Sequence, residues 1–242
     1  MFIQNRLGMI EGTETMLAHE RRMDQISNNL ANVDTAGYKK EDITFWEMMF
    51  TTADRRPRVG KALKILTDQQ QGSAKQTDNT LDFAINGDGF FKIQTAAGVR
   101  YSRNGNFTLN NEGQLSTFDG NLVLGDSGPI TLADQNVKVG RDGQITANDL
   151  PINRLGIVSF PNLQGLEKEG ASLFRLKAGA TQEQPVESPN IQQGYLEGAN
   201  VNVVSEMTEM IDLQRAYQSQ QKAIQTTDDI DQTSTSRVGK LT

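Results

Sequence analysis

Apolar residues recur every seven positions at both ends of this 242-residue chain. Near the N-terminus the repeat is Phe2, Met9, Met16, Met23 and Leu30, and near the C-terminus it is Val203, Met210, Tyr217 and Ile224. A repeat of seven places one apolar stripe along a helix, and a second helix has to cover that stripe. The two ends of the chain are therefore predicted to be long helices that pair as a coiled coil.

The N-terminal stripe has a second interpretation, a helix that lies on a globular core. Its length argues against this, because about 30 residues make a helix about 45 Å long, more than a domain of this size needs. The stripe is also rich in Met, whose flexible side chain adapts to irregular surroundings. We therefore favour contact with other helices.

The segment Ser27 to Lys40 reads SNNLANVDTAGYKK and separates the N-terminal repeat from the rest of the chain. Three asparagines, Asn28, Asn29 and Asn32, stand there although Asn is a weak helix former. Two interpretations remain open. The helix frays there and is closed by Gly37 in the left-handed conformation, or the asparagine amides form a polar contact strip for another helix.

The C-terminal repeat begins with clear helix-start signals. Asn200 or Asn202 can cap the helix, and Glu206 and Glu209 lie near the positive end of its dipole. Met207 widens the apolar stripe over the first half of the helix. We expect this helix to take up most of residues 200–242.

The middle of the chain, residues 81–179, changes to a period of two. Short apolar runs are separated by glycine-containing turn sequences, which is typical of strands joined by tight turns. Two of these hairpins echo each other, FTLNNEGQL at 107–115 and VKVGRDGQI at 137–145. This region is predicted to be a mainly-β domain.

The predicted fold class is therefore α+β, with terminal helices paired as a coiled coil and a central domain of short strands and hairpins. Residues 1–36 and 200–242 form the helical assembly domain in this prediction. Residues 37–80 and 180–199 are connectors, the first loosely ordered with one or two strands around 62–66. The β domain of residues 81–179 faces outward.

Composition excludes several classes of partner. The formal net charge is −6 and no long basic tract occurs, which argues against nucleic acid and against an anionic membrane surface. Cysteine is absent, so the chain has neither disulfides nor thiolate metal sites. The first residues lack the apolar run of a cleaved signal peptide, and no apolar stretch is long enough for a membrane span.

The sequence offers no catalytic constellation. His19 is the single histidine, and a lone histidine makes neither a triad nor a zinc site. Gly87-Asp88-Gly89 lacks the third glycine of a dinucleotide fingerprint. Asp228, Asp229 and Asp231 lack the glycine and the glutamate of a calcium loop. We predict no catalytic residue, no metal, no cofactor and no small-molecule substrate.

Four blocks of the chain resemble one protein family. SNNLANVDTAGYKK is similar to the signature of the flagellar rod, hook and hook-associated axial proteins. LDFAINGDGFFKIQ at 81–94, YSRNGNFTLNNEGQL at 101–115 and EGANVNVVSEMTEMIDLQRAYQSQQKAIQTTDDI at 197–230 are similar to successive blocks of its basal-body rod members. The resemblance covers nearly the whole chain in the same order.

The resemblance implies a structural subunit of the bacterial flagellar rod, a helical tube that crosses the periplasm. It implies that the terminal helices form an inner coiled-coil layer and the β domain faces outward. Its partners would be copies of itself, other rod proteins and the flagellar type III export apparatus, which needs no cleaved signal peptide. The connector at 40–81 looks shorter than in the distal rod member, which favours the proximal rod member.

The assembly interface predicted from these observations lies on the two helices and their asparagine-rich ends. Its residues are Met9, Met16, Met23, Asn28, Asn29, Leu30, Asn32, Asn200, Asn202, Val203, Met207, Met210, Tyr217 and Ile224. Three alternatives remain: a distal rod or hook-type axial subunit, an export chaperone or capping factor, and an adhesin or carbohydrate-binding β module with a coiled-coil stalk. The adhesin would require exposed aromatic residues, whereas Phe83, Phe90 and Phe91 occupy alternating, core-like positions.

Overall fold

The computed structural model describes residues 2–51, 57–132, 137–147, 150–170 and 172–238 of the chain. Their contacts divide the chain into two compact units. The helical unit comprises Met1–Ala31, Glu41–Leu66 and Asn202–Thr242, and the β unit comprises Asn32–Lys40 and Thr67–Val201. Long helices from the two ends of the chain and a central region of short strands confirm the predicted α+β fold class.

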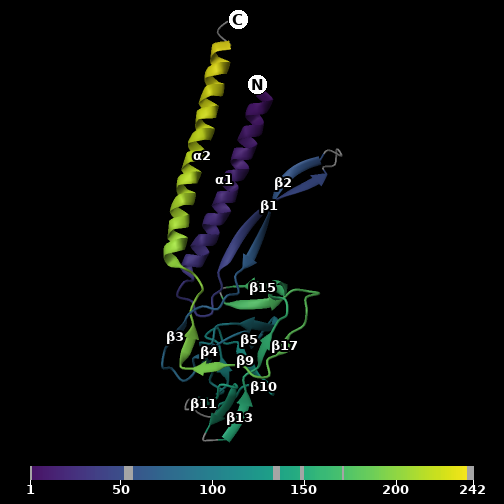
Figure 1. Cartoon of the computed structure of the whole chain (residues 1–242), viewed down its shortest axis with the longest axis vertical. Coiled ribbons are helices and arrows are strands. Elements are labelled where there is room, and N and C mark those ends of the chain that lie inside the picture. The colour runs from purple at the N-terminus through teal and green to yellow at the C-terminus, as the bar shows by residue number, and fades with distance from the viewer. Residues whose placement is uncertain (1, 52–56, 133–136, 148–149, 171, 239–242) are drawn as a thin grey trace. The chain divides into compact units, whose positions relative to one another are not determined.

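Two long helices and one hairpin form the helical unit. Helix α1 spans Phe2–Ala31 and helix α2 spans Val203–Val238, and they pack against each other along their length. They run antiparallel, as the purple and yellow helices of Figure 1 show. Strands β1 (Glu41–Thr51) and β2 (Pro57–Thr67) pair with each other, and β1 also contacts α1.

The prediction of a loosely ordered connector after residue 37 was wrong in this region. Two strands of 11 residues each occupy half of residues 37–80, whereas we expected one or two short strands around 62–66. Their apolar residues do not alternate: ITFWEMMF and VGKALKIL contain apolar pairs and triplets. A search for a period of two therefore misses them, because a strand is recognised from sequence by strict alternation of apolar and polar residues.

The β unit contains the short strands of the chain, β3 to β19. A ten-stranded antiparallel sheet has the order β15-β16-β6-β5-β9-β8-β7, with β10 on β9, β14 on β5 and β17 on β14. Its strands are β5 (Phe90–Thr95), β6 (Gly98–Ser102), β7 (Thr108–Leu109), β8 (Leu115–Ser116), β9 (Leu122–Gly125), β10 (Gly128–Pro129), β14 (Ile157–Ser159), β15 (Leu166–Glu169), β16 (Leu173–Leu176) and β17 (Gln184–Pro185). A short 3-10 helix, η1 (Leu163–Gly165), precedes β15.

Smaller sheets complete the β unit. Strands β11 (Val137–Val139), β12 (Gln144–Ala147) and β13 (Leu150–Arg154) form a meander, β18 (Ile191–Gln193) pairs with β4 (Phe83–Ile85), and β19 (Tyr195–Glu197) pairs with β3 (Ala74–Gln76). The last two pairs attach residues of both predicted connectors to the β unit.

The two echoing sequences form the same turn. Leu109 pairs with Leu115 in one hairpin, and Val139 pairs with Ile145 in the other. In each, a glycine four residues beyond the strand closes a tight turn with its backbone N–H. Gly113 donates to the carbonyl oxygen of Asn110, and Gly143 donates to that of Gly140. Both glycines have positive φ, 73° and 84°, which explains why glycine stands at both positions.

The β unit has two apolar clusters. The larger includes Phe83, Phe91, Phe107 and Leu115, each at most 2 % exposed, and the smaller centres on Phe90 and Phe174. Phe91 and Phe107 pack edge to face with ring centroids 5.2 Å apart, a favourable geometry for aromatic pairs. Phe83, Phe90 and Phe91 are therefore core residues, so they do not supply the exposed aromatic surface that an adhesin would need.

Candidate assembly surface and the buried polar joints

Contacts at Gly12, Arg22 and Asn29 of α1 join it to α2. A Cβ added to Gly12 would lie 2.8 Å from Nε2 of Gln220 and 3.3 Å from Cδ1 of Ile224. Glycine thus lets the two helices approach closely at this point. Further along α1, Nε of Arg22 donates to Oε1 of Glu209 at 2.6 Å. Both side chains are partly solvent-exposed, so the ion pair aligns the helices more than it stabilises them.

Asn29 joins α1 to both neighbouring elements. Its Nδ2 donates to the carbonyl oxygen of Glu41 at 3.0 Å and to Oε2 of Glu206 at 3.1 Å, and its Oδ1 accepts from the N–H of Glu41 at 3.2 Å. Asn29 and Glu206 are each 1 % exposed. Both amide hydrogens and the amide oxygen are therefore used, which is the satisfied state that a buried polar group needs.

The structure distributes the predicted interface residues over several environments. Met16, Met23, Leu30, Val203, Met210, Tyr217 and Ile224 are partly buried on the helix pair, and Asn29 is fully buried. Asn28, Asn202 and Met207 are exposed. The side chain of Met9 lies outside the described residues. Of the two adjacent asparagines in the predicted contact strip, Asn29 is therefore buried and Asn28 is exposed.

The remaining asparagines have local roles. Asn202 caps α2, because its Oδ1 accepts from the N–H of Ser205 at 3.2 Å. Asn200 belongs to the β unit, where it donates to the carbonyl oxygen of Asp68 at 2.9 Å and accepts from the N–H of Lys40 at 2.7 Å. Asn32 accepts from Thr35 through its backbone and its side-chain oxygen, which shapes the turn after α1.

Gly37 does have a positive φ, 68°, but it does not close α1, which ends at Ala31. A Cβ at this position would lie 2.2 Å from the backbone nitrogen of Asn104 and 2.4 Å from the carbonyl carbon of Arg103. The N–H of Gly37 donates to the carbonyl oxygen of Glu197 at 2.7 Å. The glycine therefore serves a close approach of backbones inside the β unit.

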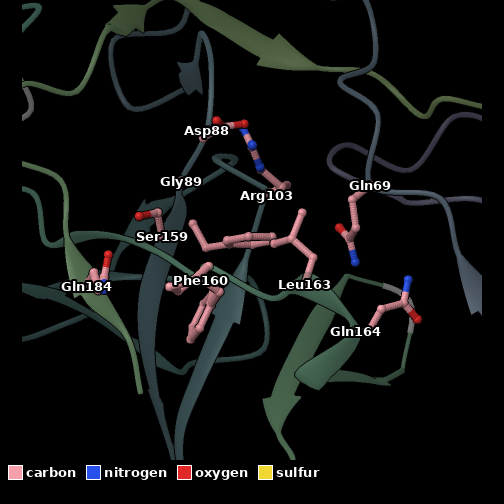
Figure 2. Close-up of a pocket in the computed structure, with 11 residues that line it drawn as sticks. Gln69, Asp88, Gly89, Arg103, Ser159, Phe160, Leu163, Gln164 and Gln184 are labelled. Carbon is pink, nitrogen blue, oxygen red and sulfur yellow. The ribbon is translucent and has the colours of Figure 1, made fainter. Parts of the chain in front are cut away.

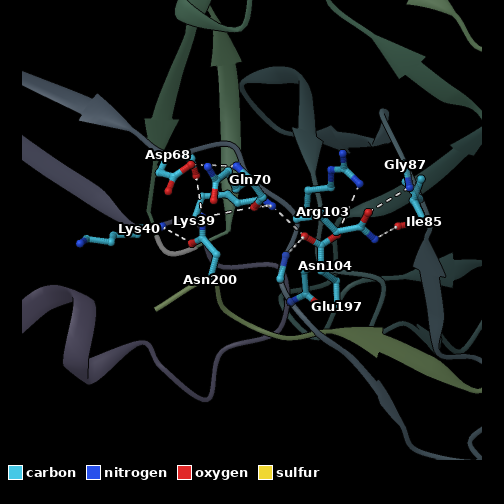
Figure 3. A network of polar contacts seen from close by, with 12 residues as sticks. Lys39, Lys40, Asp68, Gln70, Ile85, Gly87, Arg103, Asn104, Glu197 and Asn200 are labelled. Atoms are coloured by element: carbon cyan, nitrogen blue, oxygen red, sulfur yellow. Dashed lines mark hydrogen bonds and ion pairs between the residues drawn. The ribbon is translucent and has the colours of Figure 1, made fainter. Parts of the chain in front are cut away.

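The residues after Gly37 form a buried polar joint, shown in Figure 3, in which Glu197 is the centre. Nζ of Lys39 donates to Oε1 of Glu197 at 2.7 Å and to the carbonyl oxygen of Gln70 at 2.5 Å. The N–H of Gly72 donates to the same Oε1 at 3.1 Å, and Nη1 of Arg103 donates to Oε2 at 3.4 Å. Segments distant in sequence thus meet at one carboxylate.

Burial sets the electrostatics of this joint. Lys39 is fully buried, and Arg103 and Glu197 nearly so. Burial lowers the pKa of Lys39 below its ordinary value, and the Glu197 carboxylate opposes that shift. Burial also lowers the pKa of Arg103, against the carboxylates of Glu197 and Asp88. The joint therefore depends on Glu197, since an unpaired buried cation is costly.

Lys168 adds a second cation beside the joint. Its Nζ donates to the carbonyl oxygen of Lys39 at 2.8 Å and lies 3.5 Å from the centroid of the Tyr38 ring. Tyr38 is fully buried, so the cation–π contact is shielded from water. Sequence reasoning did not find these roles, because Tyr38, Lys39 and Lys40 look like an ordinary segment with two basic residues.

A hollow of about 440 Å³ lies in the β unit. Figure 2 shows Arg103 reaching toward Asp88 on one side, with Ser159 and Phe160 on β14 and just after it. The described lining residues include Ser159 but no histidine or lysine that could activate it as a nucleophile.

No group of three or more His, Cys, Asp or Glu side chains in the described part of the chain is arranged to hold a metal ion. Among the described helices, none is both long and apolar enough to span a membrane.

Comparison with known proteins identifies the family. Residues 12–39 match the model for flagella basal body rod proteins, residues 84–147 the D1 domain of flagellar hook protein FlgE/F/G, and residues 192–237 the C-terminal region of flagellar basal body rod FlgEFG proteins. These matches include Asn29, Lys39, Arg103, Glu197 and Glu206.

Relatives of two kinds match the chain over almost their whole length. The flagellar basal-body rod protein FlgF of Caulobacter vibrioides is 35% identical over 243 residues, covering 95% of this chain and 97% of the relative. The flagellar basal-body rod protein FlgG of Bacillus subtilis is 34% identical over 251 residues, covering 92% and 95%. FlgF of Mesorhizobium japonicum is 32% identical over 209 residues, covering 84% and 86%. The chain belongs to the flagellar basal-body rod FlgE/F/G family, and it is a structural rod subunit and not an enzyme.

Proposed function

We propose that this rod subunit polymerises through its two terminal helices into the tubular shaft that crosses the periplasm, and that it occupies the proximal part of the rod. The observation that carries the proposal is a set of apolar residues on α2 that stay exposed although α2 packs against α1. The β unit supplies the outward-facing part of the subunit.

Helix α2 carries two apolar stripes on different faces. Val203, Met210 and Tyr217 lie on the face that packs toward α1 and are partly buried. Val204, Met207 and Ile211 lie three and four residues apart and therefore share a second face, where they are 74%, 52% and 50% exposed. A contiguous exposed apolar stripe of this kind is typical of an interaction surface.

The proposed interface therefore combines two groups of the predicted residues. Those on the packed face hold the helix pair together, and Met207 with its exposed neighbours contacts other subunits. Leu17 of α1 is also 54% exposed, so both helices offer apolar surface to a neighbour. Partners of this surface are other copies of the chain and other rod proteins.

The proximal position rests on the length of the connector. Sequence identity favours neither type, because the FlgF and FlgG relatives differ by only one percentage point. The connector at 40–81 is shorter than expected for a distal rod member, and this favours FlgF. A distal rod or hook-type position is the alternative. Export through the flagellar type III apparatus, without a cleaved signal peptide, completes the proposal.

Replacement of a packed helix residue by Asp tests assembly through the helices. Leu30→Asp or Met210→Asp places a charge in the helix layer at a cost of several kcal/mol, and every added subunit repeats that cost. We expect loss of rod incorporation and of motility, with secretion and melting of the β unit unchanged. Ser219→Asp on an exposed face of α2 and Asp119→Ala in a turn of the β unit are the controls. Normal swimming with Leu30→Asp present in basal bodies would refute the proposal.

Basal bodies from cells that lack this chain test the position in the rod. A rod that ends before its distal segment supports the proximal assignment. A complete rod that lacks only the hook contradicts it.

A further inference from the structure

The sequence contains two Asn-Gly pairs, Asn86-Gly87 and Asn104-Gly105. An asparagine followed by glycine is open to attack from within the chain, because glycine has no side chain to shield its backbone nitrogen and its backbone is conformationally permissive. Both pairs lie in the β unit. Their surroundings differ, so the tertiary structure decides which pair can react.

The pair Asn104-Gly105 is packed against strand β4. Gly105 is buried, and a Cβ added to it would lie 1.7 Å from the carbonyl oxygen of Phe83. The carbonyl oxygen of Gly105 accepts from the N–H of Phe83 at 3.0 Å. Oδ1 of Asn104 accepts from the N–H of Asn106 at 2.9 Å. Both members of this pair are therefore held in place, which opposes a reaction between them.

The pair Asn86-Gly87 lies in the turn between β4 and β5. Both residues are exposed. Gly87 has a φ of 111°, and a Cβ added to it would have nothing within 4 Å. The turn therefore leaves room for the side chain of Asn86 to approach the backbone nitrogen of Gly87.

The side chain of Gln71 holds the backbone on both sides of Asn86. Its Nε2 donates to the carbonyl oxygen of Ile85 at 2.8 Å, and its Oε1 accepts from the N–H of Gly87 at 3.1 Å. Figure 3 marks both bonds, at Ile85 and at Gly87. The N–H of Asn86 itself donates to the carbonyl oxygen of Asn190 at 2.8 Å. The nitrogen that could attack Asn86 is thus occupied by Gln71.

We propose that Asn86 is a site of spontaneous deamidation in the folded chain and that Gln71 restrains the reaction. The nitrogen of Gly87 attacks Cγ of Asn86, and the new N–Cγ bond closes a succinimide ring. The Cγ–Nδ2 bond breaks, and Nδ2 takes up the proton of the Gly87 N–H and leaves as ammonia. One water molecule then opens the ring, which gives an aspartyl or an isoaspartyl residue. Attack requires Gly87 to give up its N–H proton, so the bond to Gln71 has to break first.

The reaction would change the charge beside the buried polar joint. It replaces a neutral amide by a carboxylate two residues before Asp88, toward which Arg103 reaches in Figure 2. An isoaspartyl product also lengthens the backbone at the end of β4, where Ile85 pairs with Ile191. The inference concerns the β unit alone and does not depend on assembly through the helices.

Mass spectrometry of peptides measures both Asn-Gly pairs in one sample. The purified full chain would be incubated in mildly alkaline buffer, folded or in guanidinium chloride. We expect comparable conversion of Asn86 and Asn104 in the denatured chain. In the folded chain we expect slower conversion of Asn86 and little conversion of Asn104. Conversion of Asn104 as fast as that of Asn86 in the folded chain, or no conversion of Asn86, overturns the proposal.

Gln71→Ala tests the restraint. It frees the N–H of Gly87 and should raise the conversion rate of Asn86 several-fold in the folded chain, while Asn104 keeps its rate. Gln70→Ala is the control, because Gln70 is equally exposed and its described hydrogen bonds are made by its backbone. An unchanged rate at Asn86 would contradict the role of Gln71. Equal acceleration at Asn86 and Asn104 would also contradict it, since a general loosening of the β unit acts on both sites.

Discussion

Asn29 of α1 donates a hydrogen bond to the carboxylate of Glu206 of α2 across 3.1 Å, although 177 residues separate them in the chain. Both are buried, and the same Asn29 amide also bridges the backbone of Glu41 on β1. A single side chain therefore links the first helix, the last helix and the hairpin of the helical unit.

Removal of this amide should weaken the helical unit. Asn29→Ala removes the amide that bonds to the Glu206 carboxylate and to the Glu41 backbone, a cost of about 1–3 kcal/mol. We expect a lower urea midpoint for the helical signal in circular dichroism. Ser27→Ala, at an exposed position nearby on α1, is the control and should leave the midpoint within error. Equal effects of the two variants would contradict the role of Asn29.

We expect Gly37→Ala to destabilise the β unit more than alanine does at any other described glycine of this unit that has a similar φ. Gly120 has a φ of 80° and nothing within 4 Å of an added Cβ, so Gly120→Ala isolates the backbone strain, about 1–2 kcal/mol. Gly37→Ala adds a clash with the backbone at Asn104, at 2.2 Å. Thermal unfolding of the two variants provides the comparison, and similar melting temperatures would rule out the close approach.

Lys39→Met should remove one of the two buried cations that pair with Glu197, the other being Arg103. Breaking a buried ion pair on one side costs about 3–5 kcal/mol, because the carboxylate stays buried. Chemical unfolding of the β unit measures the loss, and Lys75→Met on the exposed strand β3 is the control. Glu197→Gln should be at least as destabilising as Lys39→Met, because it removes the carboxylate that Lys39 and Arg103 share. A Glu197→Gln variant that is more stable than Lys39→Met would contradict the central role of this carboxylate.

Tyr101 should make the β unit less stable in alkali. Burial, with the hydrogen bond that its hydroxyl donates to Glu183 at 2.7 Å, raises the pKa of Tyr101 above its ordinary value of 10.0. Above pH 10 the unfolded chain releases this proton while the folded chain keeps it, so stability falls as pH rises.

Tyr101→Phe isolates that effect. Unfolding free energies measured between pH 9 and pH 11.5 should fall less steeply for Tyr101→Phe than for the natural chain. Tyr195→Phe, which replaces a partly exposed tyrosine, is the control and should keep the natural slope. Parallel curves for the natural chain and Tyr101→Phe would show that Tyr101 titrates normally.

Local pattern was sufficient for the helices and for the repeated hairpins. The heptads that contain Leu30 and Met210 lie on α1 and α2, because an apolar repeat on a helix is a property of neighbouring residues. The same holds for the turns at Gly113 and Gly143, where positive φ requires glycine. The alternation of apolar residues around Phe91 predicts from the sequence alone that this side chain lies in the core, where it is buried.

Only the tertiary structure decided which polar residues are buried and what they bind. Asn28 and Asn29 look alike in the sequence, yet one is exposed and the other reaches Glu206. Lys39 and Lys40 also look alike in the sequence. Of these two lysines, it is Lys39 that donates to Glu197, 158 residues away. Helix and turn signals act within a few residues, whereas the partner of a buried charge is set by how distant segments pack, and no local pattern encodes that.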